Sequence, residues 1–248
     1  MDKLLIDFHK NAKRQGPGSN EDTLKALSFI NLDNTRQIKV ADIGCGSGGQ
    51  TITLAQNLNA MITAVDLFPE FLKKLIQNAK SQGLDDKIVT LEASMEKLPF
   101  EKEEFDIVWS EGAIYNMGFE NGIKNWKEFI KTGGYIALSE ITWTTNTRPN
   151  EIEEHWKSEY PQIDTASNKI KVLEANGFSP VGYFTLPESS WTNNYYKPME
   201  ERFDEFLLKH NNSDEAQSIV EAEKYEISKF LTYKNYFSYG FYVAQKIR

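Results

Sequence analysis

One stretch decides the fold: an apolar run enters a turn with four glycines and continues into a helical sequence, VADIGCGSGGQT, residues 40–51. Glycine permits positive φ and lets a ligand approach the backbone, while the N-terminus of the following helix offers free N–H groups to an anion. The stretch therefore predicts a strand, a tight turn and a helix that together form a ligand site.

The spacing of this turn resembles a dinucleotide fingerprint. Gly44, Gly46 and Gly49 satisfy G-x-G-x-x-G, and Asp66 comes 22 positions after Gly44, at the end of the next predicted strand. A carboxylate at that place can accept hydrogen bonds from ribose hydroxyls. Taken alone, the pattern indicates an NAD site, with a simple turn residue as the alternative interpretation of Asp66.

Asp42 changes this interpretation. It lies inside an apolar strand whose neighbours should be buried, where an ionised carboxylate needs hydrogen-bond partners. The N–H groups of the glycine loop and a ligand ammonium group are suitable partners, whereas a pyrophosphate would be repelled. The sequence thus favours an adenosine ligand with a cationic amino-acid tail.

At this point the chain resembles the class I S-adenosylmethionine-dependent methyltransferases, whose first motif is an apolar strand with an acidic residue followed by G-x-G-x-G, here residues 42–48. Further matches follow in family order at residues 98–100, 105–110 and 133–135, so that the resemblance covers about 38–186. It implies S-adenosylmethionine as cofactor and S-adenosylhomocysteine as product.

The resemblance also implies roles for individual residues. Asp66 resembles the ribose-binding acid, Leu67 lies beside the adenine, Ser94 and Met95 match the adenine-edge site, and Ser110, Glu111 and Gly112 lie below the sulfonium. Gly16 and Ser19 match a segment that closes over the methionine end; a plain helix start explains them equally well. The expected cofactor-binding residues are Gly16, Ser19, Asp42, Gly44, Gly46, Asp66, Leu67, Ser94, Met95, Ser110 and Glu111.

The rest of the chain predicts the fold class. Short β-branched runs at 38–43, 60–65, 87–93, 105–110, 135–141, 178–186 and 236–246 alternate with helical stretches at 48–58, 69–82, 121–131 and 164–176. This alternation is typical of an α/β protein with a parallel sheet covered on both faces. With the family resemblance, we expect a seven-stranded, mostly parallel, doubly wound sheet whose last strand is antiparallel.

Three segments lie outside the alternation: residues 1–34, 142–163 and 187–234, the last with helical runs at 197–210 and 214–232. They hold many of the Trp and Tyr residues and contain no repeat or long linker. We expect one methyltransferase domain over 1–248, with an N-terminal helical segment and two insertions forming a helical, aromatic cap over the active site.

Composition limits the partners. The 248 residues carry 36 acidic and 28 basic side chains, a net charge of -8 and one cysteine. An acidic chain is a poor partner for phosphate backbones, so we expect no nucleic acid ligand. No apolar run is long enough to cross a membrane or to form a secretory signal, and we expect a cytoplasmic monomer or homodimer.

Methyl transfer from a sulfonium mainly requires positioning of the acceptor and exclusion of water. An amine or hydroxyl acceptor also needs a base, and Glu111, Tyr115 and Glu140 are candidates because they lie at the carboxyl ends of predicted strands. No metal site is expected, since the three histidines show no ligand spacing. Cys45 is interpreted as a small loop residue.

We therefore expect a methyltransferase that acts on a small-molecule acceptor with a nitrogen or oxygen nucleophile. Two alternatives remain open from the residues: an NAD-dependent oxidoreductase that uses the same glycine loop, and a non-catalytic module that binds S-adenosylmethionine. An aromatic pocket suits a quinone, a phenol or an amine held by cation-π contacts.

Overall fold

The structure, a computed structural model, describes residues 3–33 and 35–248; residues 1, 2 and 34 of the expected N-terminal segment lie outside the described part. Its centre is one sheet with the strand order β3-β2-β1-β4-β5-β8-β7, and a short β6 pairs with β5. The strands are β1 (Ile38–Ile43), β2 (Ala60–Asp66), β3 (Ile88–Glu92), β4 (Phe105–Glu111), β5 (Ile130–Trp143), β6 (Asp164–Thr165), β7 (Phe178–Thr185) and β8 (Phe237–Lys246).

The sheet is parallel except at β8, which runs antiparallel to both β5 and β7. Strands β1 and β4 occupy its middle and are almost entirely buried, as expected for strands covered on both faces. The predicted class, a mostly parallel doubly wound sheet with an antiparallel last strand, is confirmed.

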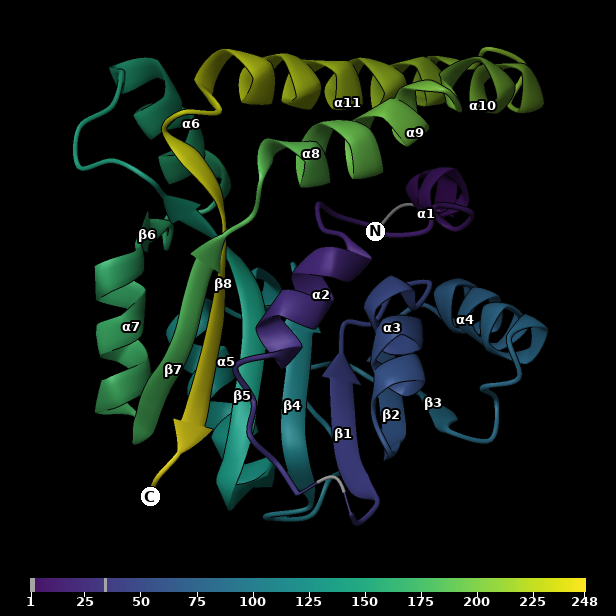
Figure 1. The fold of residues 1–248 in the computed structure, drawn as a ribbon. Coiled ribbons are helices and arrows are strands. Elements are labelled where there is room, and N and C mark those ends of the chain that lie inside the picture. Colours follow the sequence, from purple (N-terminus) through teal and green to yellow (C-terminus); the bar gives the residue numbers. More distant parts are fainter. Residues whose placement is uncertain (1–2, 34) are drawn as a thin grey trace.

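Helices cover both faces of the sheet (Figure 1). On one face α2 (Asn20–Leu27), α3 (Gly49–Asn57) and α4 (Pro69–Ser81) pack over β1 and β2 and share one apolar core with them. On the other face α5 (Phe119–Trp126) and α7 (Ala166–Ala175) build a second core around Trp126 and Phe178. Both cores end at the carboxyl edge of the sheet.

A third core lies beyond that edge, above the tips of β1 and β4 (Figure 1). It joins Phe8, Trp143 and Ile152 to the C-terminal helices, with Trp191 stacked on Phe230 at 4.5 Å. Its helices are α1 (Lys3–His9), α6 (Asn150–Glu159), α8 (Glu188–Trp191), the π-helix η3 (Thr192–Tyr196), α9 (Lys197–Glu200), α10 (Phe203–Lys209) and α11 (Asp214–Tyr233). We call this group of helices the cap.

Some predicted boundaries are wrong. The helix expected over 121–131 ends at Trp126, because the 3-10 turn η2 (Lys127–Phe129) follows and Ile130 already pairs with Phe105. The register then shifts, and Gly133, with φ 84°, lies in the bulge inside β5 instead of stopping a helix.

Strand β5 also continues further than expected. It includes Thr142 and Trp143, which pair with β6, so the segment outside the sheet begins after Trp143. The helix expected from Asp164 starts at Ala166, and the run expected over 197–210 is divided into α9 and α10. Within residues 3–33 and 35–248, no helix combines the length and the apolar character needed to cross a membrane.

Candidate functional site

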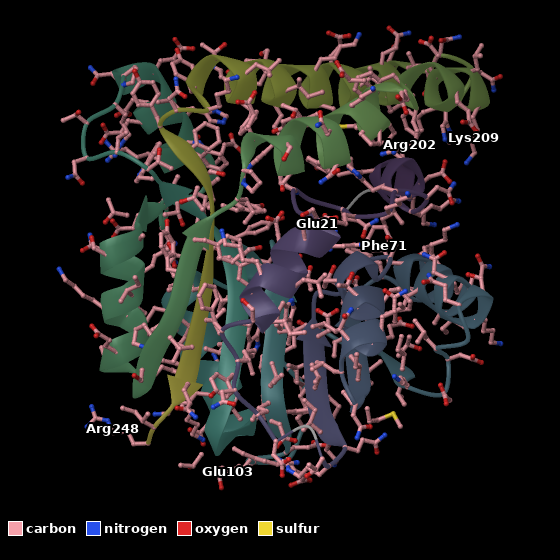
Figure 2. All side chains as sticks on the ribbon, in the orientation of Figure 1. Glu21, Phe71, Glu103, Arg202, Lys209 and Arg248 are labelled. Atoms are coloured by element: carbon pink, nitrogen blue, oxygen red, sulfur yellow. The ribbon has the colours of Figure 1, made fainter. Side chains whose placement is uncertain are left out.

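A cavity of about 480 Å³ lies at the carboxyl ends of β1, β2 and β4, and the loop between α1 and α2 forms part of its wall. This edge of a doubly wound sheet is where ligands bind. Its lining residues are Arg14, Gln15, Gly16, Pro17, Gly44, Cys45, Gly46, Gln50, Val65, Asp66, Leu67, Phe68, Phe71, Ala93, Ser94, Met95, Glu96, Glu111, Gly112, Ala113, Tyr115 and Asn116. In Figure 2, Phe71 lies toward the cap and Glu103 lies at the opposite end of the sheet.

The structure brings most of the predicted site residues together around this cavity. They come from the loop before α2, from the glycine loop and from the ends of three strands. The predicted residues in the lining are Gly16, Gly44, Gly46, Asp66, Leu67, Ser94, Met95, Glu111 and Tyr115.

Asp66 lies at the end of β2 and is tied to the glycine loop. One carboxylate oxygen accepts a hydrogen bond from the N–H of Gly46 at 2.9 Å, and the other accepts from the N–H of Phe68 at 3.0 Å. Burial nevertheless raises the pKa of Asp66, while these backbone donors oppose the rise. Each oxygen keeps a lone pair that a ligand hydroxyl can use.

Asp42 lies behind the glycine loop and does not line the cavity. Its carboxylate accepts hydrogen bonds from the Thr51 hydroxyl at 2.5 Å and from the Gln50 amide at 3.3 Å. These partners come from α3 instead of the glycine-loop N–H groups that the sequence suggested. Burial raises the pKa of Asp42 to about 7. Gln50 itself lines the cavity, so the Asp42 carboxylate contributes to the site indirectly, by holding the Gln50 side chain.

Three other expected residues also lie away from the cavity wall. Ser19 is the N-cap of α2, where its Oγ accepts from the N–H of Asp22 at 2.9 Å. Ser110 donates to the carbonyl of Ile43 at 2.8 Å and ties β4 to β1. Glu140 is fully buried and lies 3.5 Å from the Lys169 ammonium.

Glu111 is held by three donors. Arg14 contacts one carboxylate oxygen at 2.5 Å, while the Thr23 hydroxyl and the Trp109 indole N–H donate to the other at 2.8 and 2.9 Å. The Arg14 and Glu111 side chains are only 8% and 6% exposed. This buried ion pair fixes the loop before α2 against the end of β4.

Sequence reasoning missed Arg14 and Gln15, which line the cavity from a loop without a recognisable motif. Gln15 accepts from the N–H of Ser47 at 2.7 Å and donates to its hydroxyl at 3.0 Å. A Cβ built on Gly46 would lie 2.1 Å from the Gln15 side chain. The glycine at 46 therefore admits this side chain, which the pattern of glycines alone did not indicate.

Position 44 requires glycine for a different reason. Its φ is 75°, and an added Cβ would meet the Cβ of Ala113 at 2.4 Å, so the end of β1 packs directly against the loop after β4. Phe68, Phe71 and Asn116 are further lining residues that the sequence did not single out. Among residues 3–33 and 35–248, no three His, Cys, Asp or Glu side chains are grouped to hold a metal ion.

The fold and the site define a Rossmann-like domain with a cavity at its switch point. Comparison with known proteins agrees. Residues 40–134 match the family described as "Methyltransferase domain". A sarcosine/dimethylglycine N-methyltransferase of Aphanothece halophytica is 28% identical over 122 residues, 46% of this chain and 42% of that enzyme.

Two other proteins match more of the chain. A Haemophilus influenzae protein of undescribed activity is 27% identical over 197 residues, 70% of this chain and 77% of its own length. A Geobacter sulfurreducens S-adenosylmethionine-dependent methyltransferase, solved with S-adenosylhomocysteine, superposes with a TM-score of 0.86 at 14% identity, covering 99% of this chain and 98% of that one. The chain thus matches the methyltransferase-domain family over residues 40–134, and its fold as a whole is that of the Geobacter sulfurreducens methyltransferase.

Proposed function

We propose that this protein transfers the methyl group of S-adenosylmethionine to a nitrogen or oxygen nucleophile of a small molecule. The carrying observation is the cavity at the carboxyl edge, which joins Asp66, the glycine loop and Arg14 in one wall and reaches Tyr115 under the cap. The similarity to the sarcosine/dimethylglycine N-methyltransferase of Aphanothece halophytica supports a small acceptor.

The cavity fits this cofactor chemically. Asp66 offers carboxylate lone pairs for ribose hydroxyls, and Leu67, Phe68, Phe71 and Met95 supply apolar surface suited to adenine. Arg14 offers a guanidinium for the carboxylate of the methionine part. We retain Gly16, Gly44, Gly46, Ser94 and Glu111 as cofactor-site residues and assign Ser19, Asp42 and Ser110 to its support.

S-adenosylmethionine, when bound, supplies a methyl group on a positively charged sulfur that is ready for in-line displacement. The chain has three tasks: to hold the cofactor, to orient the acceptor and to exclude water. The loop before α2, fixed by Arg14 and Gln15, performs the exclusion from one side. The cap helices perform it from the other.

The catalytic candidates receive different roles. Glu111 accepts hydrogen bonds from three donors of the chain, and we propose that it positions Arg14. Tyr115 is 44% exposed and lines the cavity, so we propose that it contacts the acceptor. Glu140 lies away from the cavity and, paired with Lys169, supports the cap side of β5.

We propose one domain in which the cap encloses the acceptor, acting in the cytoplasm as a monomer or homodimer. The acidic charge of -8 supports a small acceptor over nucleic acid.

Two measurements test the proposed function. Calorimetry should show S-adenosylhomocysteine binding at tens of micromolar or tighter. S-adenosylmethionine carrying a labelled methyl group should then yield labelled product with a panel of amines, phenols and carboxylates. Absence of cofactor binding would exclude the function, and tight binding of NADH in its place would support the oxidoreductase. Cofactor binding without transfer to any panel member would favour the non-catalytic module.

A further inference from the structure

A second hollow, of about 940 Å³, lies between the helices on the sheet and the cap. Figure 1 shows α2, α3 and α4 on one side of this space and α9 on the other. The lining residues are Asn11, Ala12, Lys13, Arg14, Gly18, Ser19, Asn20, Glu21, Gly48, Gly49, Ile52, Gln56, Asn78, Gln82, Asn193, Asn194, Tyr195, Pro198, Glu201 and Arg202. Because only Arg14 of this set also lines the cofactor cavity, the second hollow is a separate space.

The loop before α2 divides the two spaces. Its residues 14–17 line the cofactor cavity, whereas residues 11–14 and Gly18 line the second hollow. Arg14 belongs to both linings, and its charge is matched by Glu111 at 2.5 Å. A molecule in the second hollow would therefore contact the same loop as the cofactor without taking the place of the cofactor.

The cap wall of the second hollow carries a guanidinium that the chain satisfies only in part. Arg202 donates a hydrogen bond from Nη1 to the carbonyl oxygen of Pro198 at 2.6 Å, and its guanidinium carbon lies 5.6 Å from the centroid of the Phe8 ring. Within residues 3–33 and 35–248, its buried Nε has no hydrogen-bond partner, and no carboxylate lies within 4.0 Å of the guanidinium. Arg202 is thus fixed in place but lacks a counter-charge in contact with it.

The surroundings of Arg202 make this missing counter-charge costly. The side chain is half-buried, and burial lowers its pKa, while Tyr195, Glu223 and Glu201 oppose this shift only in part. A guanidinium keeps its proton at neutral pH, so the charge itself remains. An anion bound in the second hollow would supply the contact that the chain does not.

The rest of the lining is suited to a polar molecule. Asn193 and Asn194 on η3 lie on the same wall as Arg202, and further amide side chains come from α3 and α4. Each amide offers both donors and an acceptor. The carboxylates in the lining, Glu21 and Glu201, are exposed, so that water and salt screen their charges. In Figure 2, Glu21 lies on α2 and Arg202 lies across from it on the cap.

We propose that the second hollow is a ligand site for a small polar molecule with a carboxylate group, separate from the sites of the cofactor and of the methyl acceptor. Arg202 binds the carboxylate, and the amides of Asn193 and Asn194 bind neighbouring hydroxyl or amide groups. A neutral or cationic molecule would leave the Arg202 charge uncompensated.

The test uses the full chain and two pairs of probes that differ in the carboxylate: gluconate with neutral sorbitol, and malate with neutral malamide. Calorimetry should show at least one carboxylate binding about tenfold or more tighter than its neutral analogue. In Arg202→Gln this preference should fall at least fivefold, while the affinity for S-adenosylhomocysteine stays unchanged and so shows that the variant is folded. Asn194→Asp, which adds a negative charge to the same wall at an exposed position, should weaken binding of the carboxylate at least fivefold.

Lys197→Gln is the matched control, because Lys197 is an exposed cation on α9 that is absent from the lining of the second hollow. It should retain the wild-type preference. Failure of the wild type to prefer either carboxylate, or an undiminished preference in Arg202→Gln, would overturn the inference.

The same measurements with and without saturating S-adenosylhomocysteine distinguish this site from the cofactor cavity. The carboxylate should bind in both cases, since the two spaces are separate. Competition with S-adenosylhomocysteine would place the carboxylate beside Arg14 in the cofactor cavity, and methyl transfer from S-adenosylmethionine to the probe would make the second hollow part of the acceptor site. Either result would overturn the inference, whereas failure of S-adenosylhomocysteine to bind would count only against the proposed function.

Discussion

Two aspartates at the ends of neighbouring strands differ in what surrounds them. Asp66 faces the cavity with two backbone donors, whereas Asp42 is sealed behind the glycine loop with only the side chains of Gln50 and Thr51. The first is available to a ligand. The second acts on the site by fixing the start of α3.

Replacing Asp66 with Ala should weaken binding of S-adenosylhomocysteine by about 1–3 kcal/mol, because charge-assisted hydrogen bonds to the ribose are lost. Calorimetry measures this directly. Asp86→Ala, in the exposed loop before β3, is the control and should bind normally. An unchanged dissociation constant for Asp66→Ala would show that the ribose lies elsewhere.

Asp42 should make stability depend on pH. Its folded-state pKa is raised from 3.8 to about 7, so the folded protein retains a proton that the unfolded chain has lost in this window. Stability from this group is therefore highest below pH 4 and falls as pH rises to 7. In urea unfolding, the difference in free energy of unfolding between Asp42→Asn and wild type should grow by about 2–3 kcal/mol in favour of the variant from pH 5 to pH 8. A pH-independent difference would contradict the raised pKa.

The Arg14–Glu111 pair should be costly to break from one side only. Arg14→Met leaves the buried Glu111 carboxylate without its cation and should destabilise the fold by about 3 kcal/mol or more in urea unfolding. The double variant Arg14→Met/Glu111→Gln should recover part of this loss. Lys124→Met, which removes a partner from the exposed pair with Glu120, should change stability by less than about 1 kcal/mol. Equal effects of Arg14→Met and Lys124→Met would show that burial of the pair does not matter.

At the scale of elements, we propose that the loop between α1 and α2 acts as a lid. Its residues 14–17 line the cofactor cavity, and the loop is held by side-chain bonds from Arg14 and Gln15. Because the loop pairs with no strand, we expect it to open more easily than the sheet beneath it, despite these bonds.

Hydrogen exchange should therefore detect cofactor binding in this lid. We expect amides in residues 10–18 to become at least tenfold slower to exchange when S-adenosylhomocysteine is added, because the ligand contacts the lid's inner side. Amides of α7, on the opposite face of the sheet, serve as the internal control. Binding without added protection in the lid would show that the loop does not close on the ligand.

The sequence predicts the elements that carry strong periodic or turn signals. Strands β1 and β4 are nearly fully buried, β2 alternates between buried and half-buried residues, and the positions of all three follow from their residues. The start of β5 does not, because Ile130 is separated from the main strand by a bulge that only pairing with Phe105 reveals. The two-residue β6 likewise depends entirely on its partner β5.

The site residues likewise include some that the sequence predicts and some that only the folded structure reveals. Asp66, Gly44 and Gly46 belong to one motif, and their proximity is visible in the sequence. Arg14 and Gln15 reach the site from a distant segment with no local pattern. Their positions depend on tertiary packing, which places the loop between α1 and α2 over the carboxyl edge of the sheet (Figure 1).

At the scale of the whole molecule, the cap and the sheet are joined through aromatic packing. Trp191 stacks on Phe230 of α11 at 4.5 Å, and its indole N–H donates to Ser238 of β8 at 2.9 Å. The cap should consequently unfold together with the sheet.

Phe230→Ala removes a ring that is only 2% exposed and should destabilise the protein by about 3–5 kcal/mol. Tryptophan fluorescence and far-UV circular dichroism should give coincident urea transitions in both wild type and variant. Leu231→Ala, on an exposed neighbouring position, is the control and should have little effect. Separate transitions would show that the cap is an independent unit.

The position of β8 in the sheet has a consequence for folding order. In the described part of the chain β7 pairs only with β8, and β8 follows every other described element. During synthesis β7 emerges long before its partner and must wait, with unpaired backbone groups, until α11 and β8 follow. Strands β1, β2 and β4, which bear the cavity, can gather early from local contacts, whereas Tyr239, whose ring packs against Gly112 of the cavity lining, arrives last with β8. A nascent chain should thus acquire nucleoside affinity before it acquires substrate selectivity.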